Sequence, residues 1–302
     1  SVTGVQTCAL PISGLCRCSR PMPHSNPIKI QPASALLLSV LTVWLWIGIA
    51  ALLNDSQLND SLEQFIWAQS LEWGYWKHPP VTTWLMYVPL HVWGTHPAWP
   101  YVLSALVYAV TVVASFKIAE KLFDADAATW VALLLTLHYG FTRRAQLYNH
   151  NSVLIAFVAL TVLATLYALR DQKNWQWLGV GLLAGLSLLV KYQAAVPIMG
   201  VLLAIASNGH LRRTANGLVG AGIICLTVVA PHVWWLTQHD FQALRYALRY
   251  LDEPDLNEQV LRQGSFWVAQ ARYHLPMFFF VLILWAIRFL RPAPPISQTA
   301  KS

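Results

Sequence analysis

The sequence contains little charge. Of its 302 residues only 11% are Asp, Glu, Lys or Arg, whereas 56% are hydrophobic. Soluble domains normally carry about a quarter charged residues, and a transmembrane helix needs about 20 consecutive apolar residues. The long runs almost free of charge therefore exclude an ordinary soluble domain and predict several membrane spans.

Motifs for nucleotides, nucleic acids and metals are also lacking. No G-x-x-x-x-G-K-S/T loop occurs, which argues against a nucleotide-sugar donor. The net charge is +7, but the basic residues are scattered, which indicates anionic lipids and topology signals rather than nucleic acid. The Cys16–Cys18 pair lacks zinc-site spacing, and the histidines match no ligand pattern. We therefore expect no cofactor, with a divalent metal left as an open alternative.

The first 21 residues fit neither a signal peptide nor a span, and they resemble a translated sequencing adapter. We expect them to be a non-native or disordered head and exclude them from the fold. Met22 is then a candidate start, and residues 22–33 form a short basic tail before the first span.

Eight apolar segments are predicted to form an all-α integral membrane protein, a polytopic helical bundle over residues 34–290. The expected spans are 34–53, 99–120, 126–142, 150–169, 175–190, 193–207, 215–236 and 265–289. Basic residues alternate between the connections, and the positive-inside rule places the following in the cytoplasm: Lys29, Lys117, Lys121, Arg170, Lys173, Arg212, Arg213, Arg288 and Arg291. Both termini, with the tail 291–302, are then inside. The large loops 54–98 and 237–264 are both external.

The first external loop is rich in aromatic residues. Six of the fifteen tryptophans fall between Trp67 and Trp99, and tryptophan concentrates at membrane surfaces. The apolar segment 79–94 is short and broken by prolines. We therefore expect interfacial helices in this loop rather than a further span.

Several cations break the positive-inside pattern, namely Lys77, Arg143, Arg144 and Lys191. Ionisable residues at membrane depth are costly and usually face a cavity or a partner. For Lys191 alone, a long side chain that reaches the outer interface is the simple alternative. Taken together, the four cations predict a shared anion site on the external side.

Two acids, Asp60 and Glu63, lie on the same side of the membrane as these cations. In a helix the i, i+3 spacing places both carboxylates on one face. A carboxylate that takes a proton from an acceptor hydroxyl, beside cations that hold a phosphate leaving group, would suit a transfer reaction. The alternative that both are solvated loop acids stays open.

Five segments in succession resemble the bacterial GT-C glycosyltransferases of the protein O-mannosyltransferase-like group, which includes aminoarabinose transferases and rhizobial galacturonosyltransferases. They are NDSLEQFIWAQSLEWGYWKHPPVTTWL (59–85), YNHNSVLIA (148–156), GLLAGLSLLVKYQAAVP (181–197), PHVWWLTQHDF (231–241) and FWVAQARYHLP (266–276). The resemblance covers about residues 34 to 290. It implies a GT-C bundle in the bacterial inner membrane.

The resemblance implies an enzyme that moves a sugar from a polyprenyl-phosphate carrier to a lipid, glycan or protein acceptor on the periplasmic face. By motif position Asp60 is the expected base, and Glu63 is a second catalytic candidate. Lys191, Arg143, Arg144 and, less directly, Lys77 are expected to bind the carrier phosphate. The matched motifs add these substrate-binding candidates: Tyr75, His78, Tyr148, His150, Asn151, Tyr192 and His239.

The chain departs from the group at two points. The acid that usually follows the aspartate is Ser61 here. Members also usually continue with further spans and an external domain, so we expect a fragment or a short form. Two alternatives stay open, a transporter of lipid-linked sugars that uses the cations without a base, and an inactive fragment or assembly partner.

Overall fold

A computed structural model describes residues 30–54, 59–142, 144–249 and 256–290. The expected head 1–21, most of the tail 22–33, Arg143 and the tail 291–302 lie outside these residues. The described helices belong to one compact unit that begins at Gln31. Within the described residues the secondary structure is entirely helical, which confirms the predicted fold class.

Each of the eight predicted spans coincides with a helix. The helices are α1 (Pro32–Leu53), α4 (Trp99–Leu122), α5 (Ala125–Leu137), α6 (His150–Asp171), α7 (Asn174–Val190), α8 (Ala195–Ser207), α9 (Leu211–Gln238) and α11 (Leu256–Leu290). Five of them (α1, α4, α6, α9 and α11) are long and apolar enough to cross a membrane, while α5, α7 and α8 are shorter. A 13-residue helix such as α5 rises about 20 Å, less than the ~30 Å hydrocarbon core.

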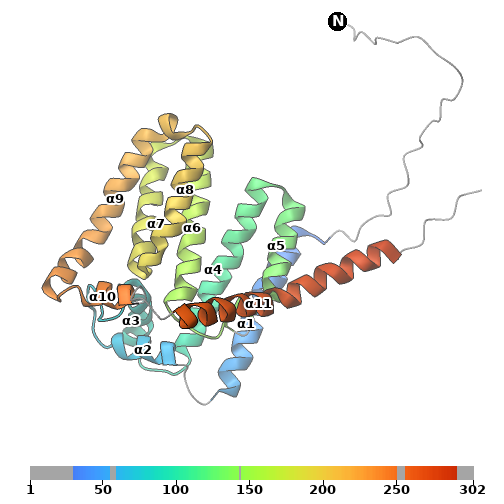
Figure 1. The fold of residues 1–302 in the computed structure, drawn as a ribbon, viewed down its shortest axis with the longest axis horizontal. Coiled ribbons are helices and arrows are strands. Elements are labelled where there is room, and N and C mark those ends of the chain that lie inside the picture. The colour runs from blue at the N-terminus through green and yellow to red at the C-terminus, as the bar shows by residue number, and fades with distance from the viewer. Residues whose placement is uncertain (1–29, 55–58, 143, 250–255, 291–302) are drawn as a thin grey trace, which may run out of the picture. The chain divides into compact units, whose positions relative to one another are not determined.

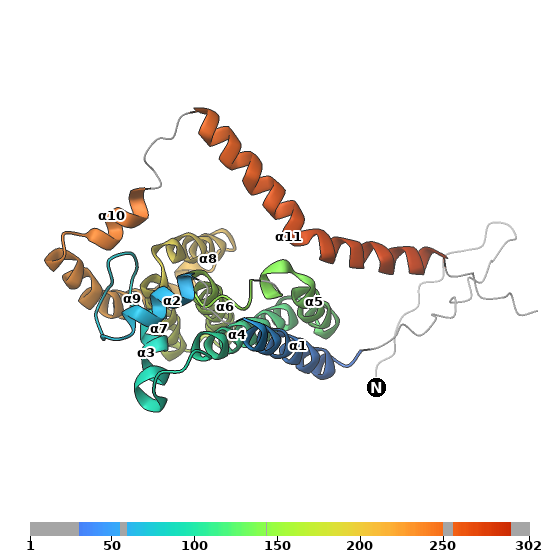
Figure 2. The same ribbon diagram turned by 90° about the horizontal axis from the view of Figure 1, so that it is seen from below.

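The two large polar loops contain further short helices. The first loop forms α2 (Asn59–Trp67) and α3 (Val81–Trp93), and the second forms α10 (Gln242–Leu248). Single 3₁₀ turns, η1 (Tyr139–Phe141) and η2 (Tyr192–Ala194), follow α5 and α7. Figures 1 and 2 show α2, α3 and α10 together at the end of the bundle where α6 begins. The helices predicted in the first loop are therefore confirmed.

The helices of the bundle pack in two groups, which meet where α4 contacts α6. Helices α1, α4 and α5 pack on one another, α4 also packs on α6, and α7 packs on α6 and α9. The contact between α7 and α9 depends on glycine, because a Cβ added to Gly181 would lie 2.2 Å from the carbonyl oxygen of Ala221. Small residues at such positions let helix backbones approach closely.

Large apolar side chains cover the outside of the spans, including Leu45 on α1 and Leu226 on α9. Exposed apolar patches of this kind mark a membrane-contacting surface. Basic residues cluster at the opposite end of the bundle from α2 and α10, at the end of α4 (Lys117 and Lys121) and at the start of α9 (Arg212 and Arg213). The protein is therefore a multi-pass membrane protein.

Candidate active site

A cavity of about 740 Å³ opens at the end of the bundle that carries the loop helices. Its walls come from α2, from the turn before α3, from the start of α6, from the break after α7 and from α10. The lining residues are Asp60, Glu63, Gln64, Lys77, His78, Asn149, His150, Asn151, Lys191, Tyr192, Gln193, Leu244, Tyr246, Ala247 and Leu248. The cavity thus joins both predicted acids to two of the four predicted cations.

Asp60 is held in place by the residue that begins α6. Asn149 Nδ2 donates a hydrogen bond of 2.8 Å to Asp60 Oδ2. The same Asn149 caps α6, because its Oδ1 accepts from the backbone N–H groups of Asn151 and Ser152. Such a cap satisfies backbone donors that a helix otherwise leaves unpaired. One side chain therefore starts the helix and orients the carboxylate.

Helix α2 is docked on the same segment of backbone. Ser61 Oγ accepts from the N–H of Tyr148 at 3.1 Å and donates to the carbonyl of Tyr148 at 3.2 Å. The hydroxyl of Tyr148 donates to the carbonyl of Thr82 at 2.7 Å, at the start of α3. These buried bonds fix α2, α3 and α6 relative to one another around the cavity.

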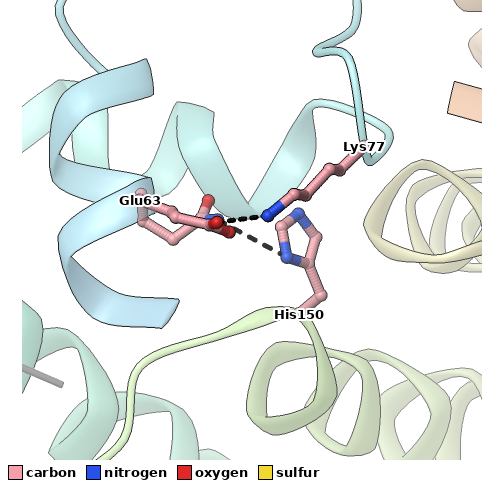
Figure 3. A network of polar contacts seen from close by, with 4 residues as sticks. Glu63, Lys77 and His150 are labelled. Carbon is pink, nitrogen blue, oxygen red and sulfur yellow. Dashed lines mark hydrogen bonds and ion pairs between the residues drawn. The ribbon is translucent and has the colours of Figure 1, made fainter. Parts of the chain in front are cut away.

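Glu63 forms an ion pair with Lys77, and His150 lies beside the pair (Figure 3). The ammonium group of Lys77 also lies 4.6 Å from the centre of the Trp76 ring and 5.7 Å from that of Tyr246. Cations are attracted to aromatic faces at such distances. Lys77 is therefore engaged by a carboxylate and two rings within the protein itself.

Two histidine rings are packed together on one wall. The ring centroids of His78 and His150 are 4.0 Å apart. Burial, together with the charges of Lys191 and Lys77, lowers the pKa of His78 to about 4, although Asp60 opposes this shift. His78 is therefore neutral at neutral pH.

His150 is 5% exposed, and a buried glutamine contacts it. Thr83 Oγ1 donates to Gln64 Oε1 at 2.8 Å, so the amide of Gln64 is left to face His150 Nδ1 at 3.5 Å. Gln64 and His78 thus hold the His150 ring on this wall of the cavity.

Lys191 enters the cavity because α7 ends at Val190. Lys191 has extended backbone angles (φ −162°, ψ 136°), and the chain resumes as η2 and α8. The Lys191 ammonium donates to Asn151 Oδ1 at 2.8 Å. The break therefore places a cation at the cavity instead of burying it between helices.

Four of the predicted residues do not line the cavity. The Tyr75 hydroxyl donates to the Ser70 carbonyl, and Tyr148 is fully buried and bonded to Thr82. Arg144 is exposed, and His239 stacks on Trp235 at 4.0 Å. These four side chains therefore lie outside the cavity, and their role in substrate binding stays a prediction. Both tyrosines hold loop backbone, and burial raises the pKa of Tyr75 to about 12, in keeping with a neutral hydroxyl.

Several lining residues were not predicted, among them Gln64, Asn149, Gln193 and Tyr246. The Asn-x-x-Ser pattern at 149–152 is a helix-start signal that could have drawn attention to Asn149. Tyr246 is contributed by α10, and its ring packs edge-on against Trp76 and His78. Within the described residues no three His, Cys, Asp or Glu side chains are grouped as metal ligands.

The fold and the site define the class as a multi-pass GT-C membrane protein. The oligosaccharyltransferase of Archaeoglobus fulgidus has a similar structure, with a TM-score of 0.52 at 12% identity over 90% of this chain and 41% of that chain. The sequence profile described as dolichyl-phosphate-mannose-protein mannosyltransferase matches residues 77–235, more than half of the chain. The chain belongs to this family.

Three curated relatives come from Rhizobium johnstonii. The lipid A galacturonosyltransferase RgtD is 24% identical over 85% of this chain and 54% of its own length. The lipopolysaccharide core galacturonosyltransferases RgtA and RgtB are 28% and 26% identical over 59% and 74% of this chain, and over 36% and 46% of their own lengths. The chain thus spans about half of the length of the curated relatives or less.

Proposed function

We propose that this protein is a glycosyltransferase that moves a sugar from a polyprenyl-phosphate carrier to a hydroxyl of a lipid or glycan acceptor. The observation that carries the proposal is that Asp60 and Lys191 line one cavity in a chain of this family. A carboxylate and a cation at one site are what such a transfer needs.

In the proposed reaction the carboxylate of Asp60 takes the proton of the acceptor hydroxyl. The freed oxygen attacks the anomeric carbon of the sugar, and the bond from that carbon to the phosphate oxygen breaks. Its electron pair stays on the phosphate, whose added charge Lys191 stabilises. A single displacement of this kind inverts the configuration at the anomeric carbon.

Asp60 is better placed to act as the base than Glu63. Asp60 accepts from the neutral amide of Asn149, whereas Glu63 is paired with Lys77. The ammonium group of Lys77 occupies a carboxylate oxygen of Glu63 that an acceptor hydroxyl would otherwise contact. Glu63 then serves to hold Lys77, and Asp60 carries the chemistry.

The relatives narrow the substrates to be tested. All three are galacturonosyltransferases, and their acceptors are lipid A or the lipopolysaccharide core. We take a polyprenyl-phosphate galacturonic acid as the donor and lipid A as the acceptor. The corresponding location is the bacterial inner membrane, with the cavity on the periplasmic face.

The test uses membranes that contain the full chain, supplied with this donor and with lipid A, and detects the product by mass spectrometry. Asp60→Asn should lower the rate at least about 100-fold, the range expected for loss of a general base. The control is Glu72→Gln, an exposed acid of the same loop that does not line the cavity. It should keep nearly full activity.

Two results would overturn the proposal. One is wild-type membranes that form no product, and the other is a rate unchanged by Asp60→Asn. If the sugar lipid instead crosses the membrane without transfer, and Asp60→Asn leaves that movement unchanged, the protein is a transporter.

A further inference from the structure

Three distant segments of the chain meet at His232, a residue of α9 that is only 1% exposed. His232 Nδ1 lies 2.7 Å from the carbonyl oxygen of Trp73 in the first loop. His232 Nε2 lies 2.8 Å from the hydroxyl of Tyr192, which lines the cavity beside Lys191. The proposed chemistry makes no use of this arrangement.

For a neutral imidazole, the partners of His232 fix the direction of both hydrogen bonds. A carbonyl oxygen only accepts, so Nδ1 carries the hydrogen and donates to Trp73. In a neutral imidazole Nε2 is then an acceptor, and the Tyr192 hydroxyl must donate to it. The hydroxyl hydrogen of Tyr192 is therefore used in a hydrogen bond within the protein and is not available to a ligand.

The packing around His232 keeps its ring from turning over and exchanging its two hydrogen-bond partners. The rings of Tyr192 and Trp235 both stack on His232, with centroids 5.8 Å and 6.0 Å away. The backbone of Gly74 packs closely against the rings of Trp235 and His232. A Cβ added to Gly74 would lie 2.4 Å from the Trp235 ring and 2.9 Å from His232 Nδ1. His232 therefore has little room to flip its ring or exchange partners.

Tyr192 can consequently offer a ligand only the lone pairs of its oxygen. A phosphate group of the carrier is anionic and has only acceptor oxygens at neutral pH, so it gains nothing from Tyr192. A sugar hydroxyl can donate. Donation from Tyr192 to His232 also strengthens its oxygen as an acceptor, since linked hydrogen bonds polarise one another.

We propose that Tyr192 accepts a hydrogen bond from a hydroxyl of the transferred sugar, and that His232 is a positioning residue that sets this polarity. The proposal rests on the proposed function and adds a division of the cavity. Lys191 and Asn151 lie on the side of the carrier phosphate, while Tyr192 marks the side of the sugar ring.

The experiment compares two lipids on the purified full chain in detergent. One is polyprenyl phosphate, and the other is polyprenyl-phosphate galacturonic acid. Tyr192→Phe, which keeps the ring, should weaken binding of the sugar-bearing lipid about three- to tenfold, the effect of one neutral hydrogen bond. Binding of polyprenyl phosphate alone should not change.

His232→Phe keeps an aromatic ring against Trp235 but removes both hydrogen bonds, and it should reproduce the selective loss. The double variant should bind no more weakly than Tyr192→Phe, because the two residues act as one unit. Tyr87→Phe on α3, outside the cavity, is the matched control. If His232→Phe does not accumulate in membranes, Tyr192→Phe decides alone.

An equal loss for both lipids, or no loss for either, would overturn the role of Tyr192. Failure of the wild-type chain to bind polyprenyl phosphate would instead overturn the proposed function itself. The two failures are therefore distinguishable in one set of measurements.

Discussion

The side-chain amide of Asn149 joins the start of α6 to Asp60, its nitrogen donating to the carboxylate over 2.8 Å while its oxygen caps the helix. The two residues are 89 positions apart in the sequence, and the segment between them includes α3, α4 and α5. The orientation of the proposed base is therefore linked to the local stability of the helix that carries His150 and Asn151.

Asn149→Asp tests the cap of α6 and the hydrogen bond to Asp60 separately. Aspartate caps helices about as well as asparagine, so the melting temperature should stay within about 2 °C of wild type. The new carboxylate cannot donate to Asp60 and repels it, so the transfer rate should fall about tenfold or more. Asn149→Ala, the comparison, should lower both quantities. Full activity in Asn149→Asp would contradict the role of this hydrogen bond.

The pair of Glu63 and Lys77 predicts an effect that a second substitution reverses. Lys77→Met leaves the charge of Glu63 unpaired beside the cavity, which should weaken binding of polyprenyl phosphate about three- to tenfold. Lys77→Met with Glu63→Gln removes both charges and should restore most of the affinity. Lys117→Met, in the Lys117–Glu120 pair at the far end of the bundle, should have no effect. A double variant as weak as Lys77→Met would mean that Lys77 binds the phosphate directly.

His78 predicts how stability depends on pH. Its pKa is about 4 in the folded protein, below the ordinary value of 6.5, chiefly because of burial. The unfolded chain therefore binds more protons as the pH falls from about 6.5 toward 4, and this destabilises the fold in that window. Thermal unfolding in detergent at pH 7.5 and pH 5 should show a smaller loss for His78→Asn than for wild type. His91→Asn, at an exposed histidine of α3, should show the wild-type loss.

The contact of α7 with α9 predicts opposite outcomes for two neighbouring glycines. Gly181→Ala forces a Cβ against the backbone of Ala221 and should destabilise the bundle by about 1–3 kcal/mol. Gly179→Ala, on the same helix with nothing within 4 Å, should be neutral or slightly stabilising because alanine favours helices. Thermal unfolding of both variants in one detergent measures the difference. Equal stability would show that α7 and α9 do not approach as closely as described.

The helices could be predicted from the sequence because membrane spans leave long apolar runs. All eight predicted segments are helical, and the expected segment 79–94 became α3. Lys191 could be connected with a cavity because its charge lies within apolar sequence, where ionisable residues usually face a cavity or a partner. The prediction followed from the cost of burying charge, which depends little on tertiary detail.

The direction of side chains could not be predicted in the same way. Tyr148 and Asn149 are neighbours in sequence, yet one is fully buried behind α3 and the other faces Asp60. Which of the two lines the cavity depends on the cap that starts α6 and on the docking of α2, contacts that span more than 80 residues. Arg144 is exposed and does not line the cavity, and no sequence feature fixes where such a basic side chain lies.

The double hydrogen bond of Ser61 with the backbone of Tyr148 limits how this chain can be redesigned. The Ser61 side chain is buried, and its hydroxyl both donates to and accepts from the backbone of Tyr148. A carboxylate at this position would place its oxygens against the carbonyl oxygen of Tyr148. An acid at position 61 would thus displace α2 rather than add a second proton acceptor. A variant library aimed at a faster transfer reaction should keep Ser61 and vary the cavity-lining residues of α10 instead.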